Sequence, residues 1–446
     1  MKMNFKPRIK IKNFGAIKST DPDNVGWLDI DKVTVFIGDQ GSGKSTVAKL
    51  ISTFMWIEKA LVRGDYDEKF FHRKGKFVNQ FLKYHRLEHY LHANSYIEYE
   101  GLEKHIVYED GRLRIENTIK SHQEAYVLPQ IMYIPAERNF ISYVKSAREL
   151  KISSESMQEF LTEFNNAKKL IKQTFNLPIG GVSLEYDRLN DRLNLKGQEY
   201  KIQLSDGSSG FQSTVPLLLV SDYLAKSVQN PKGNNMPMSE KERENFANEM
   251  KQILGNTDLS EEQRRMAISL VSARFNKKSF INIVEEPEQN LFPGSQWEIL
   301  KELLNLNNIN KNNQLVITTH SPYIVNYLSI AVAAKQTFDH SLETISNHLV
   351  DAVDSRSEYK QLLLSEALTV EDLEKQIKEK INQIVPETAW LDSGDLSVYQ
   401  LKDGRVTLLP EINGIPSDDN NLNQILIAGN ELIDQLLEIE DEYSGI

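Results

Sequence analysis

The chain has 446 residues and no cysteine, which excludes disulfide bonds, thiolate metal sites and a cysteine nucleophile. Long apolar runs are also missing: Val215 to Val220 and Tyr327 to Ala334 fall short of the ~18 apolar residues that a membrane span requires. An excess of positive charge is also missing: 52 Lys and Arg against 63 Asp and Glu give a formal net charge of −11, which argues against a protein coated in positive charge for nonspecific DNA binding. Residues 1–15 lack the apolar core of a signal peptide. These absences predict a soluble, cytoplasmic protein without a membrane partner.

A hydrophobic fraction of 40% and a charged fraction of 26% are typical of a folded globular chain. Trp27 to Ile37 reads as a strand that ends in an apolar, β-branched run, and a glycine-rich loop follows it. From Ser45 onward the pattern predicts a helix. A strand, a loop of small residues and a helix form the context in which a phosphate-binding loop works.

The loop itself reads Gly38-Asp39-Gln40-Gly41-Ser42-Gly43-Lys44-Ser45, the Walker A pattern. Its glycines let backbone N–H groups close around phosphate, and the helix N-terminus adds a favourable dipole. We expect Lys44 to reach the β- and γ-phosphates of ATP, Ser45 to offer its hydroxyl to Mg²⁺, and Thr46 to contact a phosphate further back. The flanking strand and helix disfavour a chance glycine-rich turn. The predicted nucleotide contacts here are Gly38, Gln40, Gly41, Ser42, Gly43, Lys44, Ser45 and Thr46.

Two later strands end in polar side chains. Phe280 to Val284 is followed by Glu285, which would face the Mg²⁺ shell, and by Glu286, which would polarise the attacking water. Such acid pairs are otherwise often solvated loop residues. Leu315 to Thr319 is followed by His320, at a carboxyl end where open α/β sheets bind ligands, although a lone histidine is more often structural. The predicted catalytic residues are Lys44, Glu286 and His320, with Ser45 and Glu285 as metal ligands.

The polar segment Asp206 to Ser213 precedes an apolar helix expected over Thr214 to Ser227. Backbone N–H groups at such a helix start can bind an anion, so the segment adds three predicted nucleotide contacts, Ser208, Ser209 and Gly210. A plain helix cap is the alternative.

In the order 38, 208, 285 and 320, the four elements resemble the ABC ATPase head of the OLD and structural-maintenance-of-chromosomes branch. The resemblance implies an α/β fold, an ABC-type P-loop ATPase head with a mixed or parallel sheet, helical insertions and a small C-terminal α+β segment. It also implies that Ser208 to Ser213 is a signature loop reaching a partner's nucleotide, that Gln289-Asn290-Leu291 is the D-loop, and that His320 senses the γ-phosphate. The chain departs from the family where a Leu-Ser-Gly-Gly core and a metal-facing Asp are usual. The nearest match to the Q-loop lies around Ile134 to Asn139, where Arg138 could approach nucleotide or partner.

Glu285-Glu286-Pro287-Glu288, taken with Thr319-His320-Ser321-Pro322, is similar to bacterial ATPases of anti-phage defence systems, including the PARIS, Septu and OLD-like groups. This resemblance implies a head-to-tail dimer or a larger ring of dimers, and a sensor or scaffold subunit that controls a separate effector. OLD proteins carry a C-terminal Toprim nuclease domain, which needs several acidic metal ligands. No strands ending in clustered acidic residues follow His320, so the effector would be a nuclease on another polypeptide. The alternative is a DNA-repair or DNA-clamping ATPase, which would bind DNA through the basic run His72, Arg73, Lys74, Lys76, Lys83, His85 and Arg86. The other interpretation of this basic run is a solvated helix face. A transporter subunit fits the sequence less well than a defence ATPase or a DNA clamp.

The expected organisation has six parts. Tyr96 to Thr118 reads as a hairpin that turns at Asp110-Gly111. Asn230 to Asn235 reads as a linker, and Ser239 to Arg274 as two amphipathic helices. The C-terminal helix from Asn421 to Glu442 is expected to pack in the core rather than to form a docking surface. The parts are 1–53 (core with Walker A), 54–127 (helical and hairpin insertion), 128–227 (core strand, helical lid and signature-like loop), 228–279 (helical insertion), 280–335 (Walker B and histidine) and 336–446 (C-terminal helical and hairpin segment).

Overall fold

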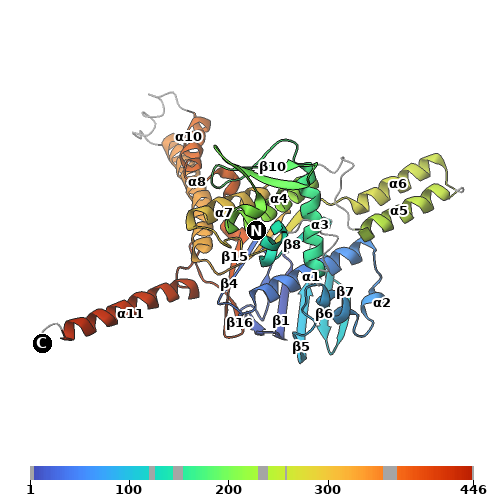
Figure 1. The fold of residues 1–446 in the computed structure, drawn as a ribbon, viewed down its shortest axis with the longest axis horizontal. Helices are drawn as coiled ribbons and strands as arrows, with labels where there is room; N and C mark the ends of the chain where they lie inside the picture. The colour runs from blue at the N-terminus through green and yellow to red at the C-terminus, as the bar shows by residue number, and fades with distance from the viewer. Residues whose placement is uncertain are drawn as a thin grey trace.

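The computed structural model describes residues 5–119, 126–143, 154–229, 240–256, 259–354 and 369–443; the linker expected at 230–235 lies outside them. The fold is built around one mixed sheet of twelve strands (Figure 1). In sheet order its strands are β7 (Arg112–Asn117), β6 (Lys104–Glu109), β5 (Leu91–Glu100), β1 (Arg8–Phe14), β2 (Ile17–Thr20), β16 (Arg405–Leu408), β15 (Leu396–Lys402), β4 (Val33–Gly38), β14 (Gln314–Thr319), β13 (Ser279–Glu285) and β8 (Pro129–Ile134), while β3 (Leu28–Asp29) pairs with β1.

Five neighbouring strands, β8, β13, β14, β4 and β15, run parallel to one another. Every residue of β4 and β13 is buried, as expected of central parallel strands covered on both faces. β4 lies between β14 and β15, with Val35 opposite Ile317 on one side and Val398 on the other. The strand that leads into the glycine-rich loop is therefore an interior strand of the parallel half.

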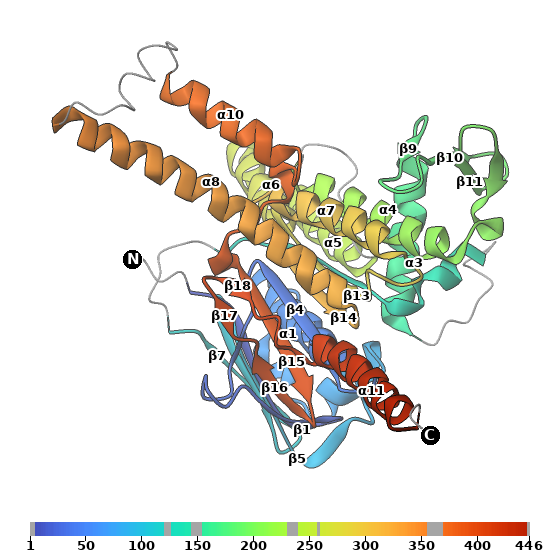
Figure 2. The ribbon, with the colours of Figure 1, turned by 90° about the vertical axis from the view of Figure 1, so that its left-hand side faces the viewer.

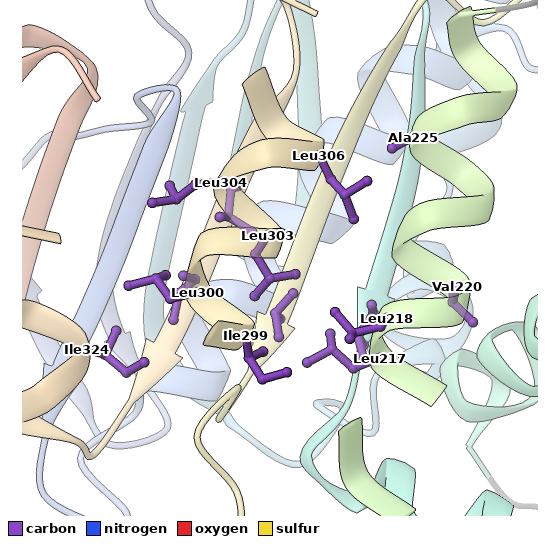
Figure 3. Packing of buried hydrophobic residues seen from close by; sticks show 14 of the residues in the cluster. Leu217, Leu218, Val220, Ala225, Ile299, Leu300, Leu303, Leu304, Leu306 and Ile324 are labelled. Atoms are coloured by element: carbon purple, nitrogen blue, oxygen red, sulfur yellow. The ribbon is translucent and has the colours of Figure 1, made fainter. Parts of the chain in front are cut away.

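Helices cover both faces of this parallel half. α1 (Lys44–Arg63) packs on one face through residues such as Val47 and Phe54. The other face carries α4 (Ser209–Gln229), α7 (Pro293–Asn308) and the first turns of α8 (Pro322–Asp354). Figure 3 shows the α7 side chain of Leu306 pointing toward Ala225 of α4, within the same buried cluster. The result is a three-layer α/β arrangement, and the predicted fold class, α/β with a mixed sheet and helical insertions, is confirmed.

The other half of the sheet is largely antiparallel. β6 and β7 form the hairpin predicted from the sequence, and its turn residues Asp110 and Gly111 have φ of 51° and 76°, as a type I′ turn requires. Next to α3 (Glu155–Leu170) lies a separate four-stranded sheet. Its strands are β12 (Lys201–Gln203), β11 (Arg192–Lys196), β10 (Ser183–Asp187) and β9 (Phe175–Asn176).

Three helical features extend from the body (Figures 1 and 2). The first is the pair α5 (Glu240–Gly255) and α6 (Glu261–Phe275), which confirms the two helices predicted there. The second is α8 with α10 (Val370–Asn382), and the third is α11 (Asn421–Tyr443). The prediction that this last helix packs in the core is wrong, because it leaves the body and its apolar side chains beyond Leu422 are exposed.

The expected division into six parts stays a proposal, and most of its boundaries fall inside helices or strands. The boundary after residue 227 cuts α4, and the boundary after residue 279 cuts β13. The boundary after residue 53 cuts α1, and the boundary after residue 335 cuts α8. Residues 54–127 also include α2 (Glu68–Phe71) and a π-helical segment (Phe77–Leu82). Among the described residues, no helix combines the length and the apolarity of a membrane span.

Candidate nucleotide site

The glycine-rich loop joins β4 to α1. Gly38, Gly41 and Gly43 have φ of 145°, 78° and 105°, which other residues rarely adopt. A side chain at Gly38 would also place its Cβ 2.5 Å from the carbonyl oxygen of Leu401. Gly43 caps α1 without a side-chain hydrogen bond, so the first N–H groups of the helix remain available to an anion.

Lys44 lies over this loop. Its ammonium donates hydrogen bonds to the carbonyl oxygens of Gly38 (2.7 Å) and Asp39 (2.8 Å) and lies 3.2 Å from Nδ1 of His320. Burial lowers the pKa of Lys44 to about 8, against the opposing effect of nearby carboxylates such as Glu286. The cation is thus held at the place where a phosphate would enter the loop.

His320 bridges Lys44 to Glu286. Its Nε2 lies 3.0 Å from Oε1 of Glu286, and the hydrogen bond from His320 is the main reason that the pKa of Glu286 is lowered. The three predicted catalytic residues follow β4, β14 and β13, which are neighbours in the sheet. Because parallel strands present their carboxyl ends at one edge, the structure brings the three side chains into one continuous series of contacts.

Glu285 and two serines have the oxygens that a Mg²⁺–nucleotide complex needs. One oxygen of the buried Glu285 carboxylate accepts the N–H of Ala136 (3.1 Å). Its Oε1, like Oγ of Ser42, has no hydrogen-bond partner within the described part of the chain, and a buried unsatisfied oxygen indicates a missing ligand. Ser45 is half-buried at the start of α1. One carboxylate, one hydroxyl and phosphate oxygens together suit Mg²⁺, which is rarely held by protein groups alone.

The same reasoning accounts for a negative result. Within the described residues, no group of three or more His, Asp or Glu side chains could hold a metal ion. A Mg²⁺ ion that takes part of its coordination from the substrate does not require such a group.

Glu288 belongs to the site, although it was not predicted as a site residue. It is half-buried, and its Oε1 accepts the hydroxyl of Thr319 (2.7 Å) and the backbone N–H of His320 (2.8 Å). Burial raises the pKa of Glu288. The carboxylate therefore fixes the turn that carries His320, and the available signal was its position two residues after Glu286 in the quoted motif.

Arg138, which was expected to approach nucleotide or partner, is fully buried within this chain. Its guanidinium donates to the backbone carbonyl oxygens of Glu285 (2.6 Å), Glu286 (2.6 Å) and Ser213 (3.0 Å). These carbonyls lie at the end of β13 and in the first turns of α4, and the planar fork of five donors suits several acceptors at once. Arg138 therefore ties the acidic end of β13 to α4.

The signature-like residues lie at the start of α4, which begins at Ser209 and not at Thr214 as expected. Ser208 and Ser209 are exposed, whereas Gly210 is buried. A Cβ at Gly210 would lie 2.9 Å from the carbonyl oxygen of Asn290, in the segment predicted as the D-loop. Asn290 in turn donates to the hydroxyl of Ser213 (3.2 Å). Gly210 therefore permits close packing within this chain, while Ser208 and Ser209 face solvent.

The remaining predicted nucleotide contacts belong to the loop and to α1. Gln40 and Gly41 are exposed at the tip of the loop. Thr46 is buried in the first turn of α1. All of the loop residues thus surround the N-terminal end of α1, while the start of α4 presents its exposed serines as a separate element.

Comparison with known proteins gives one family match. Residues 114–325 match the family model described as the AAA ATPase domain. Among the curated proteins nothing matches. The matched family is one of ATPases, and the predicted enzyme class, an ATPase, is confirmed. The matched segment contains Glu285, Glu286 and His320, and the glycine-rich loop lies before it.

Solved structures similar to this chain include an SmcHead bound to the C-winged helix domain of ScpA. That match has 11% identity and a TM-score of 0.29, and it covers 73% of this chain and 92% of the other. A nucleotide-free ATP-binding cassette from an ABC transporter has 15% identity and a TM-score of 0.23, covering 72% and 85%. The ATP-binding cassette MJ0796 bound to ADP and Pi has 14% identity and a TM-score of 0.21, covering 72% and 90%.

Proposed function

We propose that this chain is an ABC-type ATPase that binds and hydrolyses ATP at interfaces between copies of itself. In this proposal it is the sensor or scaffold subunit of an anti-phage defence complex and controls a separate effector, most simply a nuclease. The observation that carries the ATPase part is the series of contacts from Lys44 through His320 to Glu286. The defence role rests on the resemblance of the motifs around residues 285–288 and 319–322.

The residues divide the work of hydrolysis between them. Lys44 neutralises negative charge on the β- and γ-phosphates, and backbone N–H groups of the glycine-rich loop hold the same oxygens. Glu286, kept ionised by its hydrogen bond from His320, accepts a hydrogen bond from the attacking water and aligns it with the γ-phosphorus. Mg²⁺, held by Ser45 and Glu285, would supply further charge neutralisation. The products are ADP and phosphate.

A second copy of the chain completes the site in this proposal. Ser208 and Ser209 are exposed at the N-terminal end of α4, where backbone N–H groups and the helix dipole favour an anion. In a head-to-tail dimer this end of α4 would face the phosphates bound at residues 38–46 of the other copy. Two such sites per dimer make turnover depend on assembly.

The decisive experiment compares Lys44→Ala and Glu286→Gln with the wild type. Binding of a fluorescent ATP analogue and steady-state release of phosphate are measured on each. We expect Lys44→Ala to lose binding, because the phosphates lose their cation. Glu286→Gln should bind ATP normally and hydrolyse it about 10²–10³-fold more slowly, the usual effect of removing one group that acts in the transition state. Wild-type turnover in Glu286→Gln would remove this residue from the proposed role.

A DNA clamp is the second candidate, favoured only by the exposed basic residues Arg73, Lys74, Lys83 and Arg86. The structure removes His85 from this surface, since it is 2% exposed. Lys76 is half-buried, and its ammonium lies 4.5 Å from the centre of the Phe70 ring. A clamp that uses the remaining cations should lose affinity for duplex DNA steeply between about 50 and 200 mM salt. Absent or salt-independent binding would eliminate this candidate.

A further inference from the structure

α11 leaves the body of the molecule (Figures 1 and 2), and most of its large apolar side chains are exposed. Only its first turn is anchored, where Asn421 and Leu422 are buried. Beyond that turn, eight large apolar side chains in the described part of the helix are each more than half exposed: Ile425, Leu426, Ile427, Leu432, Ile433, Leu436, Leu437 and Ile439.

Ile427 lies apart on the opposite side, whereas the other seven residues lie on one side of the helix, and we call these seven the α11 apolar face. At about 100° per residue they fall within an arc of roughly 160°. Glu431 and Asp434, both exposed, fall on the opposite side. An arc of this width exceeds the narrow seam of a two-stranded coiled coil and is typical of a helix in a bundle of several helices.

The size of the face indicates an obligatory partner. The largest apolar patch on a typical monomeric protein is about 300–600 Å². Seven Leu and Ile side chains, each more than half exposed, reach the upper end of that range or exceed it, on the order of the ~800 Å² that each partner buries in a stable complex. This face is therefore large enough to sustain an interface by itself.

The charge pattern decides between possible occupants. α11 carries six acidic residues and no Lys or Arg, whereas helices that lie on membrane surfaces carry Lys and Arg on their polar side. A basic protein bound to the apolar face would not meet Glu431 and Asp434, which lie behind it. A second copy offers an equally apolar face, and both sets of these two carboxylates then remain in water.

We propose that α11 packs against α11 of other copies of this chain, through the α11 apolar face, in a contact that requires no nucleotide. It involves neither residues 38–46 nor the start of α4, so it goes beyond the proposed ATP-dependent interface. Two different self-contacts on one chain build an assembly larger than a dimer. α11 is then the element that joins ATP-dependent dimers to one another.

The absence of cysteine allows a direct test on the full-length chain. Leu436→Cys places a thiol in the middle of the α11 apolar face, and Asp434→Cys places a matched thiol on the opposite side. Both are treated with a short bis-maleimide without nucleotide. We expect Leu436→Cys to give cross-linked chains in high yield and Asp434→Cys to give at least about tenfold less. Equal cross-linking of the two variants, or none, would overturn the proposal.

Mass measurement by light scattering provides the second readout, again without nucleotide and at about 10 µM protein. In a Lys44→Ala background, which removes the ATP-dependent contact, the chain should remain oligomeric. Adding Leu432→Ser and Leu436→Ser should reduce it to a monomer, while Glu431→Ala with Asp434→Ala should leave the mass unchanged. A monomeric Lys44→Ala protein would overturn the proposal and leave the ATPase assignment standing. An oligomeric Lys44→Ala protein that still hydrolyses ATP, in a separate assay with ATP added, would overturn the ATPase assignment and leave this proposal standing.

Discussion

Glu286 has a backbone φ of 45°, a left-handed conformation that costs a residue other than glycine about 1–2 kcal/mol. Two hydrogen bonds hold it there: its N–H donates to the carbonyl of Thr318, and its carbonyl accepts from Arg138. The direction in which the proposed water-orienting carboxylate points therefore depends on a buried guanidinium. Arg138 is a positioning residue, since it contacts backbone groups and not the substrate.

Replacing Arg138 tests this dependence. Arg138→Lys keeps the charge, but one ammonium lacks the planar fork that reaches carbonyls on two elements. We expect kcat to fall about 10–100-fold while the Kd for ATP changes less than about threefold, because the glycine-rich loop is untouched. Steady-state kinetics and nucleotide titration separate the two effects, and thermal unfolding checks the fold. Parallel losses of binding and turnover would contradict a positioning role.

A second prediction concerns Glu58, which is fully buried and accepts hydrogen bonds from the Tyr99 hydroxyl and from the N–H groups of Glu103 and Lys104. Burial raises its pKa to about 7 from the ordinary 4.5. The folded protein therefore binds this proton more tightly than the unfolded chain, and stability falls as the pH rises from about 4.5 to 7. The loss is on the order of 3 kcal/mol.

Glu58→Gln should remove this part of the pH dependence, because the amide is neutral at every pH. Its free energy of unfolding in denaturant should therefore vary less between pH 5 and pH 8 than that of the wild type. Glu116→Gln, at an exposed position on β7, is the matched control and should follow the wild-type curve. Parallel curves for Glu58→Gln and wild type would refute the assignment.

Residues in short contiguous motifs could be predicted from the sequence, and residues that act through distant partners could not. The glycine-rich loop could be predicted because its whole pattern lies within eight consecutive positions. The assignment of Lys44, His320 and Glu286 to one site rested on three strand ends together with the resemblance in the order of the motifs. Arg138, in contrast, contacts carbonyls about 75 and 147 residues away in the chain, and no local pattern encodes those partners.

At the scale of elements, a buried ion cluster fastens the α5–α6 pair to the nucleotide-binding core. Glu242 of α5 receives hydrogen bonds from Arg63 of α1 (2.5 Å) and from Lys277, just before β13 (2.9 Å). Lys59 of α1 lies 3.4 Å from the same carboxylate. Burial by itself would raise the pKa of Glu242, but these cations lower it. α5 is thus linked both to the helix that follows the glycine-rich loop and to the strand that ends at Glu285.

Glu242→Gln should therefore destabilise the protein by about 3–5 kcal/mol, since buried cations lose the charge that compensates them. Loss of protection from amide exchange should begin in α5 and spread to the end of α1. Glu244→Gln, at an exposed position on the same helix, should change neither stability nor exchange. Unchanged exchange in α5 of Glu242→Gln would show that the cluster does not fasten this helix.

Elements were predicted well where periodicity is strong and poorly where tertiary contacts decide. The hairpin at Asp110-Gly111 followed from its turn residues. The start of α4 at Ser209 was not predicted from the sequence, because Gly210 joins the helix through its close packing on Asn290. α11 was assigned to the core because its amphipathic pattern indicates that one face packs against another element. The pattern cannot show whether that element belongs to the same chain or to another.

At the scale of the whole molecule, the proposals predict two steps of assembly. Glu286→Gln with ATP and Mg²⁺ should accumulate a species with an even number of chains, heavier than the nucleotide-free protein. The reason is that both ATP sites of each dimer stay closed when hydrolysis is blocked. Duplex DNA should not change this mass, in keeping with the net charge of −11. Light scattering with and without nucleotide measures it, and assembly that appears only when DNA is added would favour the clamp.

The position of β15 also has a consequence for the order of synthesis. β4, which carries the glycine-rich loop, has both of its sheet neighbours far downstream, in β14 and β15. Residues 38–46 leave the ribosome early in synthesis. The two flanking strands are made much later, because β14 begins at residue 314 and β15 at residue 396. Pairings this distant in sequence form slowly and late. A chain made only as far as residue 313 therefore carries the phosphate-binding residues without the strands that position them, and the loop reaches its final geometry only after residues 314–402 have been made.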